Sequence, residues 1–348
     1  MNPRVQTVLG DEVPESLGIT LTHEHLGMEF SHFYRKPPTH IAEKFNKFAM
    51  DKLGYIRQYP YSCHNNLLLN DKPARDAVEE DLCEFSSLDG GAIVENTTHG
   101  LGRDVTLYKT LSKETGVHII AGTGYYIEDT QPSDNMYKTV EDLYNHMRCE
   151  LTVGCDENTN VTAGFMGELA SVWPIRDFER KVIKAAGELQ KEIGCGVSFH
   201  PHRDAEAPFE IVRLYLEAGG TASKAVMSHL DRTLKGDKLL EFAGLGTYCQ
   251  FDLFGTEVSY YQLNPSFDMP SDAQRIELMK SLLLEGKVDR LLMSHDIHTK
   301  HRLVQYGGHG YSHIITNIIP KMKHKGFSQD DIDKITKHNP ATWLTIDK

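Results

Sequence analysis

Short apolar runs rich in β-branched residues recur along the chain, and segments whose apolar positions have helical spacing separate them. This alternation is typical of βαβ units with a parallel sheet. Eight such repeats fit a closed barrel better than an open nucleotide-binding sheet, and no G-x-G-x-x-G motif follows the first run. We therefore predict an α/β protein with a single (β/α)8 TIM barrel, whose strands are Ile19–His23, Ala92–Asn96, His118–Gly122, Ala163–Glu168, Gly196–His200, Ala225–His229, Thr247–Leu253 and Arg290–Asp296.

Four of the intervening segments have a clear amphipathic pattern. Gly219 and Gly286 follow the last two of them, at positions where a glycine in the left-handed conformation commonly ends a helix. The run Val5–Leu9 predicts a short hairpin that closes the barrel floor. The predicted helices are Asp104–Thr115, Asp177–Ile193, Pro208–Ala218 and Ala273–Glu285.

One interval, 26–91, is too long for a single helix and contains several prolines and aromatic residues. Long connections of this kind are usually functional, so we predict an insertion that forms a lid over the active-site mouth. The alternative is that it only covers the outer wall of the barrel. No Pro-rich or Ser-rich linker marks a boundary, so residues 1–348 are predicted to form one domain.

Composition narrows the class of protein. The chain has 348 residues and a formal net charge of −12, without a basic run, which disfavours nucleic acid or an anionic membrane as a partner. No apolar segment approaches the roughly 20 residues of a membrane span, and the first residues do not resemble an export signal. The six cysteines form no C-x-x-C pair, which predicts reduced thiols in a cytosolic protein.

Candidate metal ligands gather where the predicted strands end. With 18 histidines, about one H-x-H triplet is expected by chance, so position has to carry the hypothesis. Chemistry in a TIM barrel lies at the carboxyl ends of the strands, and strand alternation puts both histidines of the first strand on one face. Any single histidine here is more often a buried, hydrogen-bonded residue, but six such positions favour a metal centre. They are His23, His25, Glu168, His200, His229 and Asp296.

Nitrogen and oxygen donors suit two divalent ions, zinc in the first place, with manganese, cobalt or iron as alternatives. Glu168 has two oxygens and is the natural bridge between the ions. Two divalent ions together with Glu168, Asp296 and one shared hydroxide would leave a net charge of +1, which favours an anionic substrate or a developing oxyanion. Asp296 is expected to be the catalytic base, which takes a proton from the activated water and passes it to the leaving group.

An anionic substrate also needs cations or donors in the mouth of the site. Arg232 and Arg203 are the first candidates, although a structural ion pair is an equally good interpretation of each. Tyr125 and Tyr126 are expected to line the pocket, and His298 to reach the substrate or brace Asp296. Weaker candidates for the anion are Arg176, Lys300 and Arg302.

The segment Gly18–His25, G-I-T-L-T-H-E-H, resembles the G-x-T-L-x-H-E-H signature of the phosphotriesterase family within the amidohydrolase superfamily. The resemblance covers essentially the whole chain and is closest to an animal branch of that family. Further motifs that carry it are Gly102–Asp104, Gly122–Gly124, Val94–Thr97, Met166–Glu168, Met227–Thr233, Tyr248–Glu257, Ser294–Lys300 and Tyr306–His313.

The resemblance implies a binuclear site. His23, His25 and Asp296 would hold the more buried metal, His200 and His229 the more exposed one, and Glu168 would bridge them in place of the carboxylated lysine of bacterial members. The animal branch is associated with hydrolysis of N-acetyltaurine to taurine and acetate, and more weakly of N-acetyl amino acids. A lactonase or esterase, or a catalytically silent metal-binding barrel, stays open as an alternative. A monomer and a homodimer are both compatible with the sequence.

Overall fold

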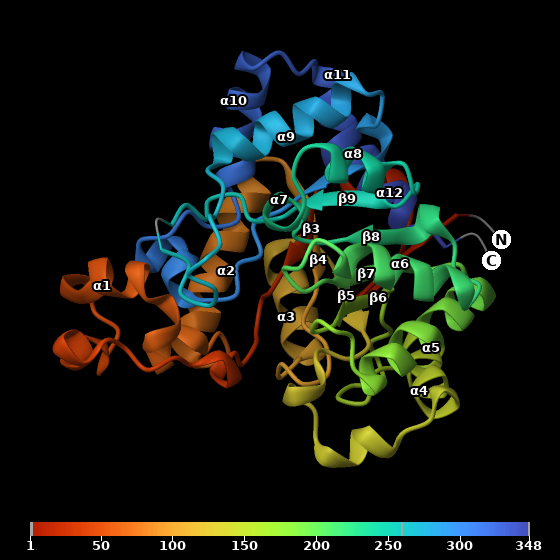
Figure 1. The fold of residues 1–348 in the computed structure, drawn as a ribbon, viewed down its shortest axis with the longest axis horizontal. Helices are drawn as coiled ribbons and strands as arrows, with labels where there is room; N and C mark the ends of the chain where they lie inside the picture. Colours follow the sequence, from red (N-terminus) through yellow and green to blue (C-terminus); the bar gives the residue numbers. More distant parts are fainter. Residues whose placement is uncertain (1–2, 259, 347–348) are drawn as a thin grey trace.

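A computed structural model describes residues 3–258 and 260–346. Eight parallel strands form a nearly closed barrel, and each pairs with the next along the chain (Figure 1). This confirms the predicted TIM barrel. Each of the eight predicted runs overlaps one strand of the barrel. The strands are β3 (Ile19–Glu24), β4 (Gly90–Glu95), β5 (His118–Thr123), β6 (Phe165–Ala170), β7 (Gly196–His200), β8 (Ala225–Met227), β9 (Tyr248–Phe251) and β10 (Leu291–Met293).

Contacts at the carboxyl ends of β10 and β3 bring the first and last strands of the sheet together. The Ser294 hydroxyl accepts a hydrogen bond from the backbone N–H of His23 at 3.0 Å. The backbone N–H of Asp296 donates to the carbonyl of His23 at 3.1 Å. Two candidate ligands that are about 270 residues apart in sequence are thereby fixed against each other.

Helices cover the outside of the barrel. Gly219 (φ 97°) and Gly286 (φ 69°) adopt the left-handed conformation just after α6 and α9, which confirms the predicted helix ends. The helices are α1 (Leu53–Gln58), α2 (Lys72–Ser87), α3 (Val105–Thr115), α4 (Val140–Thr152), α5 (Asp177–Ile193), α6 (Ala207–Glu217), α7 (Leu230–Thr233), α8 (Asp237–Ala243), α9 (Asp272–Leu284), α10 (Ile319–His324), α11 (Gln329–Asp333) and α12 (Asn339–Leu344).

The barrel has two apolar cores. One fills the interior of the barrel, and the other lies between the strands and the surrounding helices. Inward residues such as Val94, Phe165 and Leu292 pack with Val5 and Trp343 from the two ends of the chain. The antiparallel hairpin of β1 (Val5–Thr7) and β2 (Gly10–Glu12) confirms the predicted hairpin at this end of the barrel. The packed floor leaves the opposite, carboxyl ends of the strands as the place for a site.

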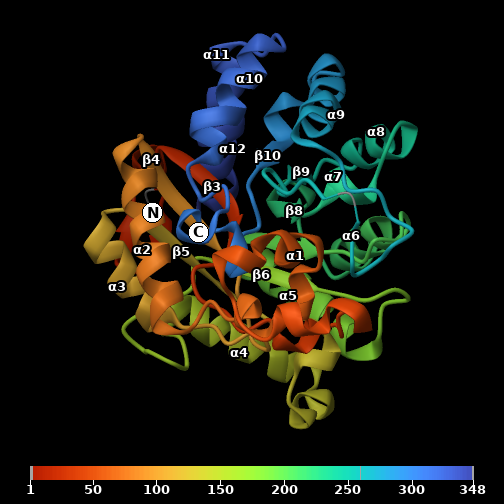
Figure 2. The same ribbon diagram turned by 90° about the vertical axis from the view of Figure 1, so that its left-hand side faces the viewer.

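The interval 26–91 has two parts. Its last part is α2, the first helix of the outer layer, and the irregular remainder carries short helices, α1 among them (Figure 2). Backbone hydrogen bonds tie the irregular part together, for example Leu69 to Met28 at 2.9 Å, and Glu29 to Leu101 at 2.8 Å. Within the described ranges, no helix has both the length and the hydrophobicity that a membrane crossing requires.

Candidate metal centre

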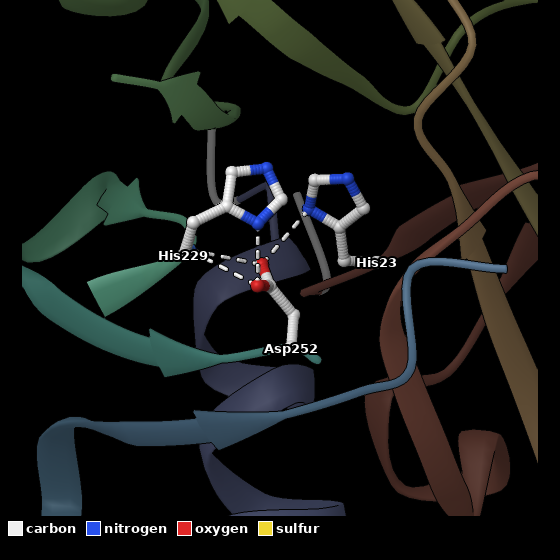
Figure 3. A group of neighbouring side chains, drawn as sticks. All are labelled: His23, His229 and Asp252. Carbon is white, nitrogen blue, oxygen red and sulfur yellow. Dashed lines mark hydrogen bonds and ion pairs between the residues drawn. The ribbon is translucent and has the colours of Figure 1, made fainter. Parts of the chain in front are cut away.

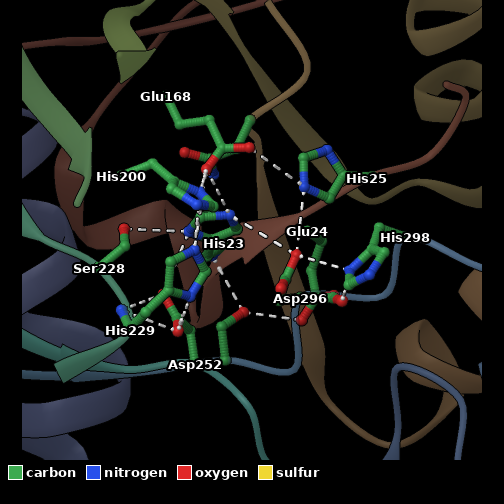
Figure 4. Close-up of polar contacts among 12 residues, drawn as sticks. His23, Glu24, His25, Glu168, His200, Ser228, His229, Asp252, Asp296 and His298 are labelled. Atoms are coloured by element: carbon green, nitrogen blue, oxygen red, sulfur yellow. Dashed lines mark hydrogen bonds and ion pairs between the residues drawn. The ribbon is translucent and has the colours of Figure 1, made fainter. Parts of the chain in front are cut away.

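The six predicted ligands meet at the carboxyl ends of five strands; Figure 3 shows two of them and Figure 4 the whole group. Glu168 lies in the middle. Its Oε1 is 3.6 Å from His25 Nε2, and its Oε2 is 2.7 Å from His200 Nδ1 and 3.4 Å from His23 Nε2. His229 Nε2 is 3.9 Å from the same Oε2. The two oxygens of one carboxylate therefore face different histidines, as a bridging ligand requires.

Two of these ligands sit on strained backbone. His229 (φ 59°) and Asp296 (φ 54°) are left-handed, although they are not glycine. Such conformations cost free energy and concentrate at functional positions, where they aim a side chain. They also explain why β8 and β10 end at Met227 and Met293, before the predicted ends at His229 and Asp296. The chain turns there and directs both side chains toward the barrel axis.

The residues fit divalent cations by two tests. His23 is buried, and its Nε2 has no hydrogen-bond partner, so one nitrogen lone pair in a dry site is unused. In addition, no lysine or arginine of the described chain forms an ion pair with the buried carboxylates of Glu168 or Asp296. Buried carboxylates without a basic partner are costly unless a cation compensates them.

Burial and neighbouring charges set the protonation of the group. Burial alone would raise the pKa of Glu168, but His200 and His23 outweigh it and hold that pKa well below its ordinary value. Burial lowers the pKa of His200 to about 3, so its imidazole is neutral near pH 7. Burial would also lower the pKa of His23, but the carboxylates of Glu168 and Asp252 outweigh it and raise that pKa well above its ordinary value. Metals bind neutral imidazole and ionised carboxylate, so an ion at this site would displace a proton from His23.

A second layer of polar residues orients the ligands; the sequence suggested that Glu95 or Asn96 faces the site but did not predict Thr97 or Asp252. Thr97 Oγ1 is 2.9 Å from His25 Nδ1 and donates to Glu95 Oε1 at 2.6 Å. Asp252, directly after β9, lies 2.7 Å from His229 Nδ1 and 3.1 Å from His23 Nδ1. Asp252 could have been found by the rule that selected the ligands, since it lies at the end of the predicted strand Thr247–Leu253. The negative charge of Asp252 also cancels the net charge of +1 that was expected from two divalent ions, Glu168, Asp296 and one hydroxide.

A cavity of about 160 Å³ opens above the ligands. One wall is apolar and comes partly from the irregular insertion, through Phe30 and Phe33. Another wall is cationic. Arg203 Nε and Arg232 Nη1 both donate to the hydroxyl of Tyr261, at 3.0 and 3.2 Å. The cationic character of the pocket therefore comes from arginine side chains.

The two arginines have no carboxylate partner among the described residues, and Nε of the buried Arg232 has no hydrogen-bond partner at all. Asp231, the obvious partner for Arg232, instead pairs with Arg275 of α9 at 2.8 Å. The structural interpretation of Arg232 as half of an ion pair is therefore not supported by its contacts.

Of the predicted pocket residues His298, Tyr125 and Tyr126, all but Tyr125 border the cavity. His298 lines the cavity, with Nδ1 3.2 Å from Asp296 Oδ1 and Nε2 3.1 Å from the hydroxyl of Tyr61. Tyr125 lies outside the cavity, with its hydroxyl 2.6 Å from His146 Nδ1, and Tyr126 lines the wall in its place.

Of the three weaker cation candidates, only Arg302 borders the cavity. Arg176 pairs with Asp129, and Lys300 with Asp71. Arg302 donates to the backbone carbonyl of Asp296 at 2.6 Å and also lines the cavity.

Residues 3–344 match the phosphotriesterase family. Phosphotriesterase-related proteins of Drosophila mojavensis and Drosophila melanogaster are each 54% identical to the chain, and the matches cover 99% of both partners. Among solved structures, a resiniferatoxin-binding protein of Rhodobacter sphaeroides superposes with a TM-score of 0.93 at 25% identity, covering 98% of this chain and 94% of that one. A lactonase of Listeria monocytogenes shares the fold with a TM-score of 0.79 at 23% identity, covering 99% and 100%.

Proposed function

The chain belongs to the phosphotriesterase family of metal-dependent hydrolases, and we propose that it is an amidohydrolase of small N-acetylated amines with an anionic tail. N-acetyltaurine, cleaved to taurine and acetate, is the substrate we put first, followed by N-acetyl amino acids. The observation that carries this proposal is the pair of guanidinium groups of Arg203 and Arg232, which face the cavity without a carboxylate partner. A sulfonate or carboxylate supplies the missing negative charge.

The cavity also fits a short acyl group. Phe30, Phe33 and Tyr126 give one side an aromatic lining, while the ligand cluster closes the bottom. A small substrate that places its anionic end on the arginines therefore presents its amide carbonyl to the ligand cluster. Polar contacts at one end and apolar contacts at the other fix the orientation of a small ligand.

His23, His25 and Asp296 would hold one divalent ion, His200 and His229 the other, and Glu168 would contact both. Two such ions, when bound, supply Lewis acidity, which polarises a carbonyl and lowers the pKa of water toward about 7. Zinc is the first choice of metal, because all six donors are nitrogen or oxygen atoms that suit it.

Asp296 is placed to move the proton. Its carboxylate borders the cavity, and the His298 contact at 3.2 Å holds it in place. Burial would raise the pKa of Asp296, but the neighbouring His298 and a hydrogen bond from His25 keep it well below its ordinary value. The ionised carboxylate takes a proton from the attacking water and delivers it to the departing nitrogen. Amides need this protonation, because an amine anion is a very poor leaving group.

A lactonase is the second candidate. The apolar wall of the cavity, with Phe30, Phe33 and Leu253, also suits the carbon skeleton of a lactone ring. The Listeria neighbour is itself a lactonase. In a lactonase, Asp296 and the six expected metal ligands would have the same roles as in the amidohydrolase. An ester needs less protonation of its leaving group, so loss of the proton shuttle would affect a lactone less than an amide.

The proposed enzyme acts on a small molecule in the cytosol, as a monomer or homodimer, without nucleic acid or membrane partners. All six cysteines are free thiols, which supports a reducing compartment.

Parallel assays on metal-loaded protein test the proposed reaction. N-acetyltaurine, N-acetyl amino acids, lactones and paraoxon are compared by kcat/KM. We expect N-acetyltaurine to be preferred; a preference for a lactone of more than about 100-fold would overturn the amidase assignment.

Arg232→Met tests the role of the cationic wall. Loss of charged hydrogen bonds worth about 1.5–3 kcal/mol should raise KM for N-acetyltaurine roughly 10-fold to 100-fold. N-ethylacetamide, which lacks the anionic end, is the matched control and should be cleaved equally by both proteins. An equal loss on both substrates would mean that Arg232 serves the fold or the metal ligands instead.

A further inference from the structure

Asp252 contacts one histidine from each of the two expected metal sites. It is fully buried directly after β9, and its carboxylate lies against the neighbouring rings of His229 and His23 (Figure 3). Asp252 Oδ1 is 2.7 Å from His229 Nδ1, and Oδ2 is 3.1 Å from His23 Nδ1. The backbone N–H of His229 also donates to both oxygens, at 3.0 and 3.2 Å.

The same contacts exclude Asp252 as a ligand. Besides the two imidazoles and the backbone N–H, the amide of Gln250 donates to Oδ2 at 2.9 Å. Its oxygens thus accept from the backbone N–H and Nδ1 of His229 and from the Gln250 amide. His23 Nδ1 lies 3.1 Å away and also contacts Ser228 Oγ at 3.1 Å, and both Asp252 oxygens face the Nδ1 side of the rings, away from Glu168. Asp252, His23 and His229 form a tight cluster of possible donors, but its hydrogen bonds are already made.

An ionised carboxylate only accepts hydrogen bonds, so the Nδ1 atoms that face it carry the protons. Nε2 of each ring is then the free lone pair, and both Nε2 atoms point toward Glu168, at 3.4 Å for His23 and 3.9 Å for His229. One side chain therefore fixes the tautomer and the orientation of two ligands that come from different strands. Partners of this kind raise the basicity of a histidine ligand and commonly change metal affinity 10-fold to 100-fold.

We propose that Asp252 is a positioning residue that couples the two metal sites, because it holds one ligand of each. The inference rests on the binuclear part of the proposed function and is independent of the substrate. Its consequence is that a change at Asp252 weakens both ions together, whereas a change at the partner of a single non-bridging ligand, such as Thr97 beside His25, weakens one ion only.

Asp252→Asn tests this coupling. An asparagine has one acceptor oxygen and one donor nitrogen, so it cannot accept from both Nδ1 atoms. Stepwise zinc binding, measured by competition with a chromophoric chelator and checked by elemental analysis, should show both dissociation constants raised about 10-fold to 100-fold. The absorption spectrum of the cobalt-loaded protein should change for both ions, which a general loss of stability would not produce.

Thr97→Val is the matched control. It removes the hydroxyl that orients His25 Nδ1 at 2.9 Å, conserves the shape of the side chain, and lies on one ligand only. We expect one of the two dissociation constants to rise and the other to stay within about twofold. If Asp252→Asn also affects one ion only, or neither, the coupling is wrong.

A milder variant covers the case in which Asp252→Asn does not fold. Gln250→Met removes the amide that donates to Asp252 Oδ2 and keeps a similar side-chain volume. Both dissociation constants should rise by a smaller factor, about 2-fold to 10-fold; a change at one site alone contradicts the proposal. If the wild type binds two ions but cleaves no amide, the proposed substrate fails and the coupling stands, whereas a wild type that binds fewer than two ions overturns the coupling.

Discussion

Among the described residues, possible metal donors of histidines and carboxylates come close together in two places, and in only one of them do the carboxylates lack a basic side chain. The metal centre has been described above. The second, the Arg103 cluster, lies around Arg103, Glu150, His99 and His146, and its possible metal donors are also within 4.8 Å of one another. A count of residue types would therefore select both.

The difference lies in how the charges are compensated. In the Arg103 cluster, Arg103 pairs with the fully buried Glu150, and Nη1 is 2.9 Å from its Oε2. His99 Nε2 is 3.2 Å from the same carboxylate, while His146 contacts Tyr125 and Asp156. No buried polar atom of these four residues lacks a partner among the described atoms.

The metal centre has the opposite character. The carboxylates of Glu168 and Asp296 form ion pairs with histidines only, and His23 Nε2 makes no hydrogen bond. A guanidinium already occupies the place that a cation would take in the Arg103 cluster. Unpaired donor atoms and uncompensated buried charge are thus better indicators of a metal site than the proximity of suitable residues.

The largest effect is expected from Asp296→Asn in the metal centre. Asparagine tolerates the left-handed backbone at this position and still offers an oxygen, but it cannot carry the proton. The rate of amide hydrolysis should fall roughly 100-fold to 10,000-fold, with metal content largely retained. Turnover kinetics and elemental analysis on the same preparation measure both quantities. Near-full turnover in this variant would exclude Asp296 as the proton shuttle.

Glu150→Gln should show the opposite pattern in the Arg103 cluster. Removal of the only partner from a buried ion pair costs about 3–5 kcal/mol. Arg103 keeps its second partner, the half-exposed Glu157 at 2.6 Å, so the loss of the fully buried Glu150 charge should cost no more than the lower end of this range, about 3 kcal/mol. Chemical denaturation of the metal-loaded protein measures the free energy of unfolding. Metal content and kcat at 25 °C should stay within about twofold of the wild type; loss of a bound ion would give the cluster a metal-binding role.

The pH dependence of that stability is a control on its cause. Burial would raise the pKa of Glu150, but hydrogen bonds from His99 and Arg103 lower it far below the ordinary value of 4.5. A lowered carboxyl pKa stabilises the fold fully above the unfolded-state pKa, and this stabilisation is lost as the pH falls toward the folded-state pKa. The stability difference between wild type and Glu150→Gln should therefore be constant above about pH 5 and shrink below about pH 4.5.

The smallest effect is expected from Tyr125→Phe, which sharpens the boundary between the two regions. The Tyr125 hydroxyl contacts His146 and Lys138, on the side of the Arg103 cluster. Its loss should leave KM for N-acetyltaurine within about twofold and reduce stability by about 1 kcal/mol. Tyr126→Phe is unsuitable as a comparison because that ring lines the cavity. A large rise in KM for Tyr125→Phe would place this residue in the pocket after all.

The course of the chain after each strand limited what the sequence could predict about side-chain direction. His200 and His25 follow the strand alternation and were placed by it. Beyond β5 the alternation fails, because Gly124 has φ 127° and the next residue turns away from the mouth. Tyr125 is thereby directed to His146, and Tyr126 takes the expected position in the wall.

The partner of each charged group was beyond the reach of local patterns. Asp231 and Arg232 are neighbours in sequence, yet Asp231 bonds to Arg275, 44 residues away, and leaves Arg232 for the cavity. Asp252 was visible as a polar residue at a strand end. Its contact with His23, which comes from the first strand of the barrel, exists only in the closed barrel.

The sequence by itself determined the barrel and predicted which six residues gather at its mouth, because both follow from short-range regularities: apolar runs set the strands, and parallel strands bring their carboxyl ends to one side. The tertiary structure decided which charges are compensated. Barrel closure brings Asp252 against two ligands, gives Glu150 a guanidinium and leaves Arg232 without a carboxylate. Electrostatic compensation depends on distances of a few ångströms between residues that are far apart in the chain, and no local pattern records those distances.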